Sequence, residues 1–201
     1  MEIELAETDF NINPKSFFLE PFDEIWFEVG FGSGEHLVWQ AKQNPQVGFI
    51  GCEPYLNGVG RLLSKVDKKN LSNIRIFRDD ARILIQLMAS ASIARAFFLF
   101  PDPWPKARHK KRRILSNSVI NQLSVLLADN AELRIATDDQ EYKESILQQV
   151  LSSGNFDWPA FQAKDWQGRS LDWPETRYEA KAKNAGRKST FFCFRRRPRK
   201  Y

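Results

Sequence analysis

The feature of this sequence that most constrains its fold is a regular alternation of two apolar patterns. Short apolar runs of strand length recur at residues 24–29, 48–53, 73–77, 95–100 and 132–137. The segments 35–43, 56–69, 81–88, 117–127 and 140–151 place apolar residues three and four apart, as in helices with one buried face. Because parallel strands need crossover connections, we predict a doubly wound α/β fold, a mostly parallel sheet with helices on both faces.

The length of 201 residues suits one such sheet. We expect a single domain over residues 24–201, preceded by a lead-in segment over residues 1–23 that shows no sustained period. Residues 156–174 hold three tryptophans without periodicity, and the apolar run 189–194 predicts a late strand. The sequence has neither a membrane-length apolar run nor a secretory signal, so we expect a cytoplasmic protein without membrane contact.

Cysteine and histidine are scarce in this chain. Cys52 and Cys193 both lie in apolar runs that predict strands, and His36 and His109 are the only histidines. We therefore expect neither a disulfide framework nor a bound metal.

The net charge of +5 is unevenly distributed. Residues 106–113 hold six Lys or Arg and residues 195–200 hold five, without an acid in either block, so the rest of the chain is acidic. Basic blocks on an acidic body are typical of proteins that hold a polyanion on one face. For the C-terminal block, a role in solubility is an equally good interpretation.

A glycine-rich turn follows the first predicted strand. Gly30, Gly32 and Gly34 precede a helix, where glycines allow a sharp bend and leave backbone amides facing a ligand. The same glycines also fit a plain tight turn or a nicotinamide cofactor site. Glu53 ends the second strand about twenty residues later, where an acid commonly accepts hydrogen bonds from a ribose, which favours an adenosine-containing cofactor.

Acidic pairs follow the third and fifth predicted strands. Asp79 and Asp80 lie where a carboxylate can meet an adenine amino group, and Asp138 and Asp139 lie at the corresponding end of the fifth strand. Helix N-capping is the alternative interpretation for both pairs, and the two roles are compatible.

The segment after the fourth strand gives the sharpest signal. Pro101, Pro103 and Pro105 restrict the residues before them, so we expect Phe100, Asp102 and Trp104 to be extended and stiff. A stiff carboxylate suits methyl transfer or base binding, so Asp102 is the leading catalytic candidate, whereas Trp104 also fits a packing role. The basic residues that follow are suited to gripping phosphates beside a reacting base: Lys106, Arg108, Lys110, Lys111, Arg112 and Arg113.

Together these motifs resemble those of the bacterial tRNA (guanine-N7)-methyltransferase family. The similarity runs from about Glu24 to Arg196 and includes, in order, EVGFGSG, GCEP with GVGRLL, DDAR, FPDPWPKARHKKRR, ATDD and TRYE. The long proline-rich and basic stretch is its most specific part. The resemblance implies a Rossmann-like methyltransferase fold, S-adenosylmethionine as cofactor and tRNA as partner, with the guanine at position 46 of the variable loop as the target.

The resemblance also implies roles for individual residues. By motif, Glu28, Glu53 and Asp80 contact S-adenosylmethionine, and Asp102 is catalytic and also touches the cofactor. Two positions depart from the family pattern, since Tyr178 replaces a more usual Phe and Asp139 stands where an aromatic residue is common. The positions that the resemblance assigns to substrate binding are Lys106, Asp138, Thr176, Arg177, Tyr178 and Glu179.

Guanine N7 carries an in-plane lone pair and no proton, so its methylation needs positioning and no general base. Asp102 either stabilises the positive charge that develops on the purine or anchors the guanine through its N1 and N2 hydrogens.

The main alternative to this function is a methyltransferase acting on protein or a small molecule. A nicotinamide-dependent oxidoreductase leaves Asp102 unexplained, and a non-enzymatic RNA-binding protein leaves the acids at four strand ends unexplained. We expect no obligatory protein partner, and either a monomer or a homodimer.

Overall fold

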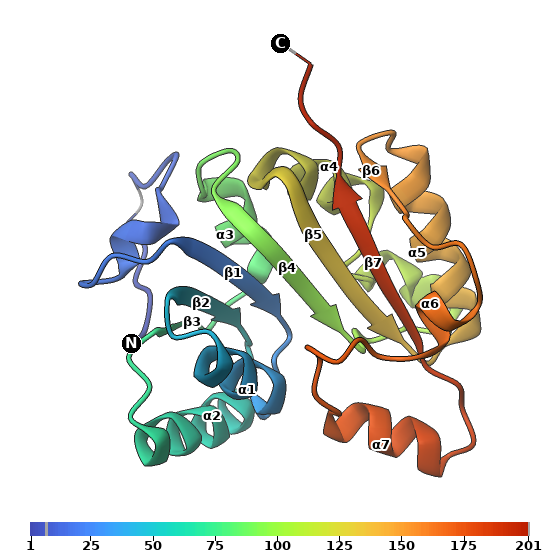
Figure 1. Ribbon diagram of the computed structural model, residues 1–201, viewed down its shortest axis with the longest axis horizontal. Helices are drawn as coiled ribbons and strands as arrows, with labels where there is room; N and C mark the ends of the chain where they lie inside the picture. The colour runs from blue at the N-terminus through green and yellow to red at the C-terminus, as the bar shows by residue number, and fades with distance from the viewer. Residues whose placement is uncertain (7, 201) are drawn as a thin grey trace.

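The computed structural model describes residues 1–6 and 8–200, and its strands form one seven-stranded sheet (Figure 1). In chain order the elements are η1 (Pro14–Phe17), β1 (Glu24–Val29), α1 (Glu35–Gln43), β2 (Val47–Cys52), α2 (Leu56–Lys69), β3 (Ile74–Phe77), α3 (Ala81–Leu87), β4 (Ile93–Leu99), η2 (Ala107–Arg112), α4 (Asn117–Leu126), β5 (Leu127–Thr137), α5 (Gln140–Ser152), β6 (Phe156–Asp157), α6 (Lys164–Gln167), α7 (Arg177–Asn184) and β7 (Thr190–Arg196).

The strand order is β3-β2-β1-β4-β5-β7-β6. Strands β1 to β5 are mutually parallel, whereas β7 runs antiparallel to both β5 and β6. After β3 the chain crosses back to place β4 on the other side of β1, so the direction of strand addition reverses between β1 and β4. The doubly wound, mostly parallel α/β fold predicted from the alternation is confirmed.

Two hydrophobic clusters cover the two faces of the sheet, because successive strand residues point to opposite sides. In β1, Ile25 and Phe27 belong to the cluster that includes the apolar faces of α3, α4 and α5. Trp26, between them, belongs to the second cluster with α1 and α2. Figure 1 shows α1 and α2 together on one side of the sheet. The predicted placement of helices on both faces is confirmed.

Most predicted bounds agree with the structure to within a few residues, and α1 and α2 match the predictions at both ends. The main difference is β5, which begins at Leu127 rather than near residue 132. Its first half contains Asp129 and Asn130, which locally favour a turn. Pairing of Leu127 with Ile93 of β4, across a register shift, makes this stretch part of the sheet.

The lead-in segment lies along the β3 edge of the sheet. Ile3 donates its amide to the Ile76 carbonyl at 2.7 Å, and the Ile76 amide donates to the Met1 carbonyl at 2.9 Å. Ile3 and Phe18 are buried in the hydrophobic cluster that also includes α3, α4 and α5. The segment therefore covers an edge strand whose backbone groups would otherwise be open to pairing.

The late strand predicted at 189–194 is β7, and arginines that end it or follow it bond to the protein itself. Arg196 donates to the Ser124 carbonyl at 2.8 Å, and Arg197 donates to the Asp157 carboxylate at 2.7 Å. Arg199 donates to the carbonyls of Val125 and Leu127 at 2.7 and 2.9 Å. Much of the C-terminal basic block thus has a structural role that neither sequence interpretation included.

The two cysteines are free thiols in β2 and β7. In the described part of the chain, His, Cys, Asp and Glu side chains form no group of three that could hold a metal ion. No helix within residues 1–6 and 8–200 has both the length and the apolar character needed to cross a membrane.

Candidate active site

A cavity of about 430 Å³ opens at the carboxyl ends of β1, β2, β3 and β4. The strand order reverses at this place, and open α/β sheets bind ligands in the crevice formed there. The cavity brings together predicted site residues that are far apart in the sequence: Gly30, Glu53, Asp80, Asp102, Arg112 and Tyr178. Its volume lies within the range of small-molecule sites.

The turn between β1 and α1 requires its glycines. Gly30, Gly32 and Gly34 have φ values of 72°, 56° and 73°, which side chains rarely adopt. A Cβ on Gly32 would lie 3.1 Å from the ring of Tyr178, and one on Gly34 would lie 2.5 Å from Leu62. The turn therefore combines a backbone path that glycine adopts readily with close packing beside the cavity.

Glu53 is a buried carboxylate fixed by the backbone around it. It accepts hydrogen bonds from the amide of Gly32 at 2.8 Å and from that of Tyr55 at 3.1 Å. Burial raises its pKa and the charge of Asp102 adds to this, while the two amide bonds oppose the rise. A carboxylate has about four acceptor positions, so acceptor capacity remains for a ligand hydroxyl.

Asp80 is the N-cap of α3, which is one of the two roles predicted for it. Its side chain accepts from the Arg82 amide at 3.0 Å and caps α3. The side-chain hydrogen bond from Arg82 is the main cause that lowers the pKa of Asp80. Asp80 also lines the cavity, so the cap and a ligand contact are compatible in this geometry.

The segment around Asp102 differs from the extended strip that we expected. Phe100 and Trp104 have φ values of 54° and 43°, outside the extended region. Tertiary packing overrides the local preference imposed by the prolines: the ring of Phe100 packs against Phe191 with centroids 6.4 Å apart, and Trp104 lies under the Arg112 guanidinium at 5.0 Å. Asp102 itself is exposed and lines the cavity together with Trp104.

Most of the basic block after Asp102 lies in η2. Some of its side chains bond to other residues of the protein, and the others are exposed. Arg113 is buried, donates to the Pro103 carbonyl at 2.7 Å and lies over the Tyr142 ring at 4.7 Å. Because it supports the proline-rich segment from inside, we leave Arg113 out of the proposed phosphate contacts. Lys110 forms an ion pair with Glu141 at 2.6 Å. The other members of the block are exposed: Lys106, Arg108, Lys111 and Arg112.

The positions assigned to substrate binding are not all in the cavity. Asp138 pairs with Arg187 at 2.6 Å. Thr176 caps α7 by accepting from the Glu179 amide at 3.2 Å, and the Glu179 carboxylate accepts from Arg169 at 2.9 Å. Tyr178 lines the cavity, whereas the adjacent Arg177 lines a separate groove. Figure 1 shows α7 beyond the carboxyl ends of β4 and β5.

Glu28 lies inside the core and is not among the residues that line the cavity. Its carboxylate oxygen is 2.7 Å from Nδ1 of His36, which is also buried. Gln40 lies 3.2 Å from the other ring nitrogen of His36 and donates to the Asp172 carbonyl at 2.7 Å. In this structure the Glu28 carboxylate therefore contacts α1 through His36, and its predicted contact with the cofactor stays a prediction.

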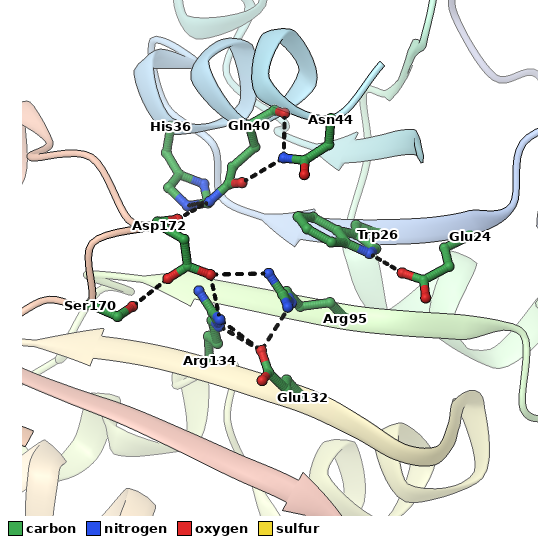
Figure 2. A network of polar contacts seen from close by, with 10 residues as sticks. All are labelled: Glu24, Trp26, His36, Gln40, Asn44, Arg95, Glu132, Arg134, Ser170 and Asp172. Carbon is green, nitrogen blue, oxygen red and sulfur yellow. Dashed lines mark hydrogen bonds and ion pairs between the residues drawn. The ribbon is translucent and has the colours of Figure 1, made fainter. Parts of the chain in front are cut away.

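Asp172 is a residue that the sequence interpretation missed. Figure 2 shows its carboxylate joined to Arg134, Arg95 and Ser170, at 2.8, 3.5 and 2.6 Å. Partial burial alone would raise its pKa, but the hydrogen bonds from Arg134 and Ser170 and the nearby arginine charges lower it to about 2. The segment around Asp172 has no periodic pattern, so no local signal marked it. It anchors the chain just before α7.

The fold is that of known methyltransferases. A family model described as "Putative methyltransferase" matches residues 23–192. An rRNA methylase from Streptococcus thermophilus shares the fold with a TM-score of 0.59 and 14% identity, over 88% of this chain and 89% of that chain. SMU.1697c from Streptococcus mutans, solved in complex with SAH, has a TM-score of 0.57 and 11% identity, over 88% and 90%. The chain is therefore a Rossmann-like methyltransferase.

The sequence narrows this class further. The tRNA (guanine-N(7)-)-methyltransferase of Rhodospirillum rubrum is 46% identical over 188 residues, which cover 94% of this chain and 74% of that protein. The chain belongs to the tRNA (guanine-N7)-methyltransferase family, and the resemblance seen in the motifs is confirmed.

Proposed function

We propose that this protein transfers a methyl group from S-adenosylmethionine to N7 of the guanine at position 46 in the variable loop of tRNA. The observation that carries the proposal is the cavity in which Asp102 meets Glu53, Asp80 and the glycine turn. The exposed part of the basic block begins four residues after Asp102. Membership of the family and the SAH in a protein of the same fold support this assignment.

The residues of the cavity fit S-adenosylmethionine. The remaining acceptor positions of Glu53 suit a ribose diol, and Asp80 suits the adenine amino group. The glycine turn allows close approach of the backbone to the ligand. When bound, S-adenosylmethionine supplies a methyl group on a positively charged sulfur, which an uncharged nucleophile can attack.

The task of the protein's own residues is to orient the base. N7 needs no deprotonation, so alignment with the methyl group is the main source of acceleration and contributes roughly 7–11 kcal/mol in favourable cases. Asp102, exposed at the cavity, accepts hydrogen bonds from the guanine edge or stabilises the charge that the purine gains. Trp104 and Arg112 lie beside it and limit the space open to the base.

Capture of the RNA depends on charge. We propose that Lys106, Arg108, Lys111 and Arg112 contact phosphates near the target base, with Lys110 joining them by exchanging its Glu141 partner. Thr176 and Glu179 act indirectly: Thr176 caps α7, and the Glu179 carboxylate pairs with Arg169, which together fix where Arg177 and Tyr178 lie. Binding that depends on such contacts weakens steeply as salt increases.

The proposal is tested by incubating the purified protein with radiolabelled S-adenosylmethionine and an unmodified tRNA transcript, followed by nucleoside analysis. We expect label in 7-methylguanosine, and we expect it to be lost with a matched transcript in which guanine 46 is replaced by adenine. A protein that binds the cofactor but labels neither transcript would favour the alternative class that acts on protein or a small molecule.

The role of Asp102 is tested by Asp102→Ala. We expect kcat to fall about 100-fold or more, the scale seen when one fixed electrostatic partner is removed from a site. Affinity for S-adenosylmethionine, measured by calorimetry, should change only modestly because Glu53 and the glycine turn are untouched. Asp67→Ala is the matched control, since it removes an exposed carboxylate that does not line the cavity. Unchanged turnover of Asp102→Ala would refute the assignment.

A further inference from the structure

A second concave surface lies beside the cavity, between α2, the start of α1 and α7. Its lining includes four basic side chains, Arg61, Lys65, Lys68 and Arg177, and one acidic side chain, Glu35. We call this surface the α2 groove. These basic residues lie outside both the basic block after Asp102 and the C-terminal basic block.

The basic residues of α2 lie on one face of the helix. Arg61, Lys65 and Lys68 are spaced at four and three residues, and the opposite face buries Val59 and Leu62 in the core. Lys65 bonds to Glu35 at 2.9 Å, so the single acid of the α2 groove already has a partner. Arg61, Lys68 and Arg177 are exposed, which leaves the groove with an excess of free positive charge.

Packing explains only one of the two glycines of α2. A Cβ on Gly58 would lie 2.4 Å from the Gly32 carbonyl, so packing against the glycine turn excludes any side chain there. A Cβ on Gly60 would meet no atom within 4 Å, and Gly60 lines the α2 groove. Glycine inside a helix is unfavourable relative to alanine. Packing does not explain Gly60, whereas close approach of a ligand backbone to the helix does.

The α2 groove and the cavity are lined by consecutive residues at two places in the chain. Tyr55 lines the cavity and the next residue, Leu56, lines the groove. In α7, Arg177 lines the groove and the next residue, Tyr178, lines the cavity. The two sites are therefore neighbours, and one polymer chain can reach from one to the other.

We propose that the α2 groove binds the sugar–phosphate backbone of the same RNA whose guanine enters the cavity, an inference that rests on the proposed function. Arg61 and Lys68 are seven residues apart, which in a helix is roughly 10 Å, so they can meet two different phosphates of one strand. Arg177 continues this track toward Tyr178. The groove and the basic block after Asp102 then hold the RNA on two sides of the target base.

The test compares two double variants with the same change in net charge. Arg61→Glu with Lys68→Glu reverses charge in the α2 groove, and Lys42→Glu with Lys69→Glu reverses exposed charges on α1 and α2 that do not line it. Binding of the unmodified tRNA transcript is measured over a series of salt concentrations, and cofactor affinity is measured by calorimetry. Lys65 is left in place because it bonds to the carbonyl of Ser33 beside the glycine turn.

We expect the groove variant to bind the transcript at least tenfold more weakly. The slope of the logarithm of the binding constant against the logarithm of salt concentration should shrink by about two, one for each phosphate contact. The control variant should stay within threefold of the wild type, and both should bind S-adenosylmethionine normally. Unchanged affinity of the groove variant, or an equal loss in both variants, would overturn the inference.

Parallel nucleoside analysis keeps this result separate from the proposed function. If the wild type forms 7-methylguanosine and the groove variant binds as tightly as the wild type, the function stands and the groove inference fails. If the wild type forms none, yet its binding to the transcript depends on Arg61 and Lys68, the proposed function fails and the groove inference stands.

Discussion

Two carboxylates of the cavity are held by different physical means. Asp102 is exposed but lies between Phe100 and Trp104, whose positive φ values of 54° and 43° cost on the order of 1–3 kcal/mol each. Packing of their rings sustains that strain. Glu53 is buried instead and is fixed by two backbone amides. The difference in exposure agrees with the roles proposed for them, in which Asp102 contacts the substrate and Glu53 the cofactor.

The raised pKa of Glu53 predicts how cofactor affinity depends on pH. The carboxylate form accepts a ribose diol and protonation removes acceptor capacity, so affinity should fall as pH drops through a value above the ordinary 4.5. Calorimetry between pH 7.5 and 5 measures this. Glu53→Gln should bind more weakly and lose the dependence, whereas Glu35→Gln, outside the cavity, should retain it. A dependence that persists in Glu53→Gln would show that another group causes it.

At the scale of elements, the C-terminal arginines donate hydrogen bonds to carbonyls at the C-terminal end of α4. Carbonyls at the end of a helix have no partner within the helix, and basic side chains satisfy them well. Arg196 and Arg199 supply these bonds at Ser124, Val125 and Leu127, and Arg199 also pairs with Asp129. Charge counted along the sequence is therefore a poor guide to charge available for RNA in this segment.

Removal of one of these arginines should affect stability more than RNA binding. We expect Arg199→Ala to lower the free energy of unfolding by about 1–3 kcal/mol, because several acceptors and Asp129 lose a charged partner. Urea denaturation measures this, with the exposed Arg195→Ala as the control. Transcript affinity should be the same in both variants within twofold, and a selective loss in Arg199→Ala would instead assign the residue to the RNA interface.

At the scale of the whole molecule, Asp172 joins distant parts of the chain. Its carbonyl bonds to Gln40, which is 132 positions away, and its carboxylate bonds to Arg134, 38 positions away (Figure 2). Through Gln40 and His36 the network extends to Glu28 beside the glycine turn. The segment that leads into α7 is thereby held against both α1 and the central strands.

The lowered pKa of Asp172 predicts a specific acid sensitivity. Its folded pKa of about 2 lies below the ordinary value of 3.8, so its ionic contribution to stability is present above about pH 4 and is lost as pH falls through 2. We expect Asp172→Asn to be less stable than the wild type at pH 5 and to approach it toward pH 2, measured by urea denaturation. Asp157→Asn, from a largely exposed pair, should show little difference at either pH. A constant gap would contradict this account.

The sequence by itself determined the α/β class, the bounds of α1 and α2, and the strand ends that form the cavity. These features follow from periodicity and from the steric properties of Gly, which act between residues close in the chain. The glycine turn and the position of Asp102 at the carboxyl end of β4 were predictable for the same reason.

Only the tertiary structure decided which charged groups are free. Arg113 and Lys106 belong to one basic run, yet the former is buried against Tyr142 and the latter is exposed. The burial of Glu28, the role of Asp172 and the α2 groove likewise depend on partners many residues away. A side chain's exposure and charge environment are set by whatever the fold packs beside it, and that neighbour has no fixed spacing in the sequence.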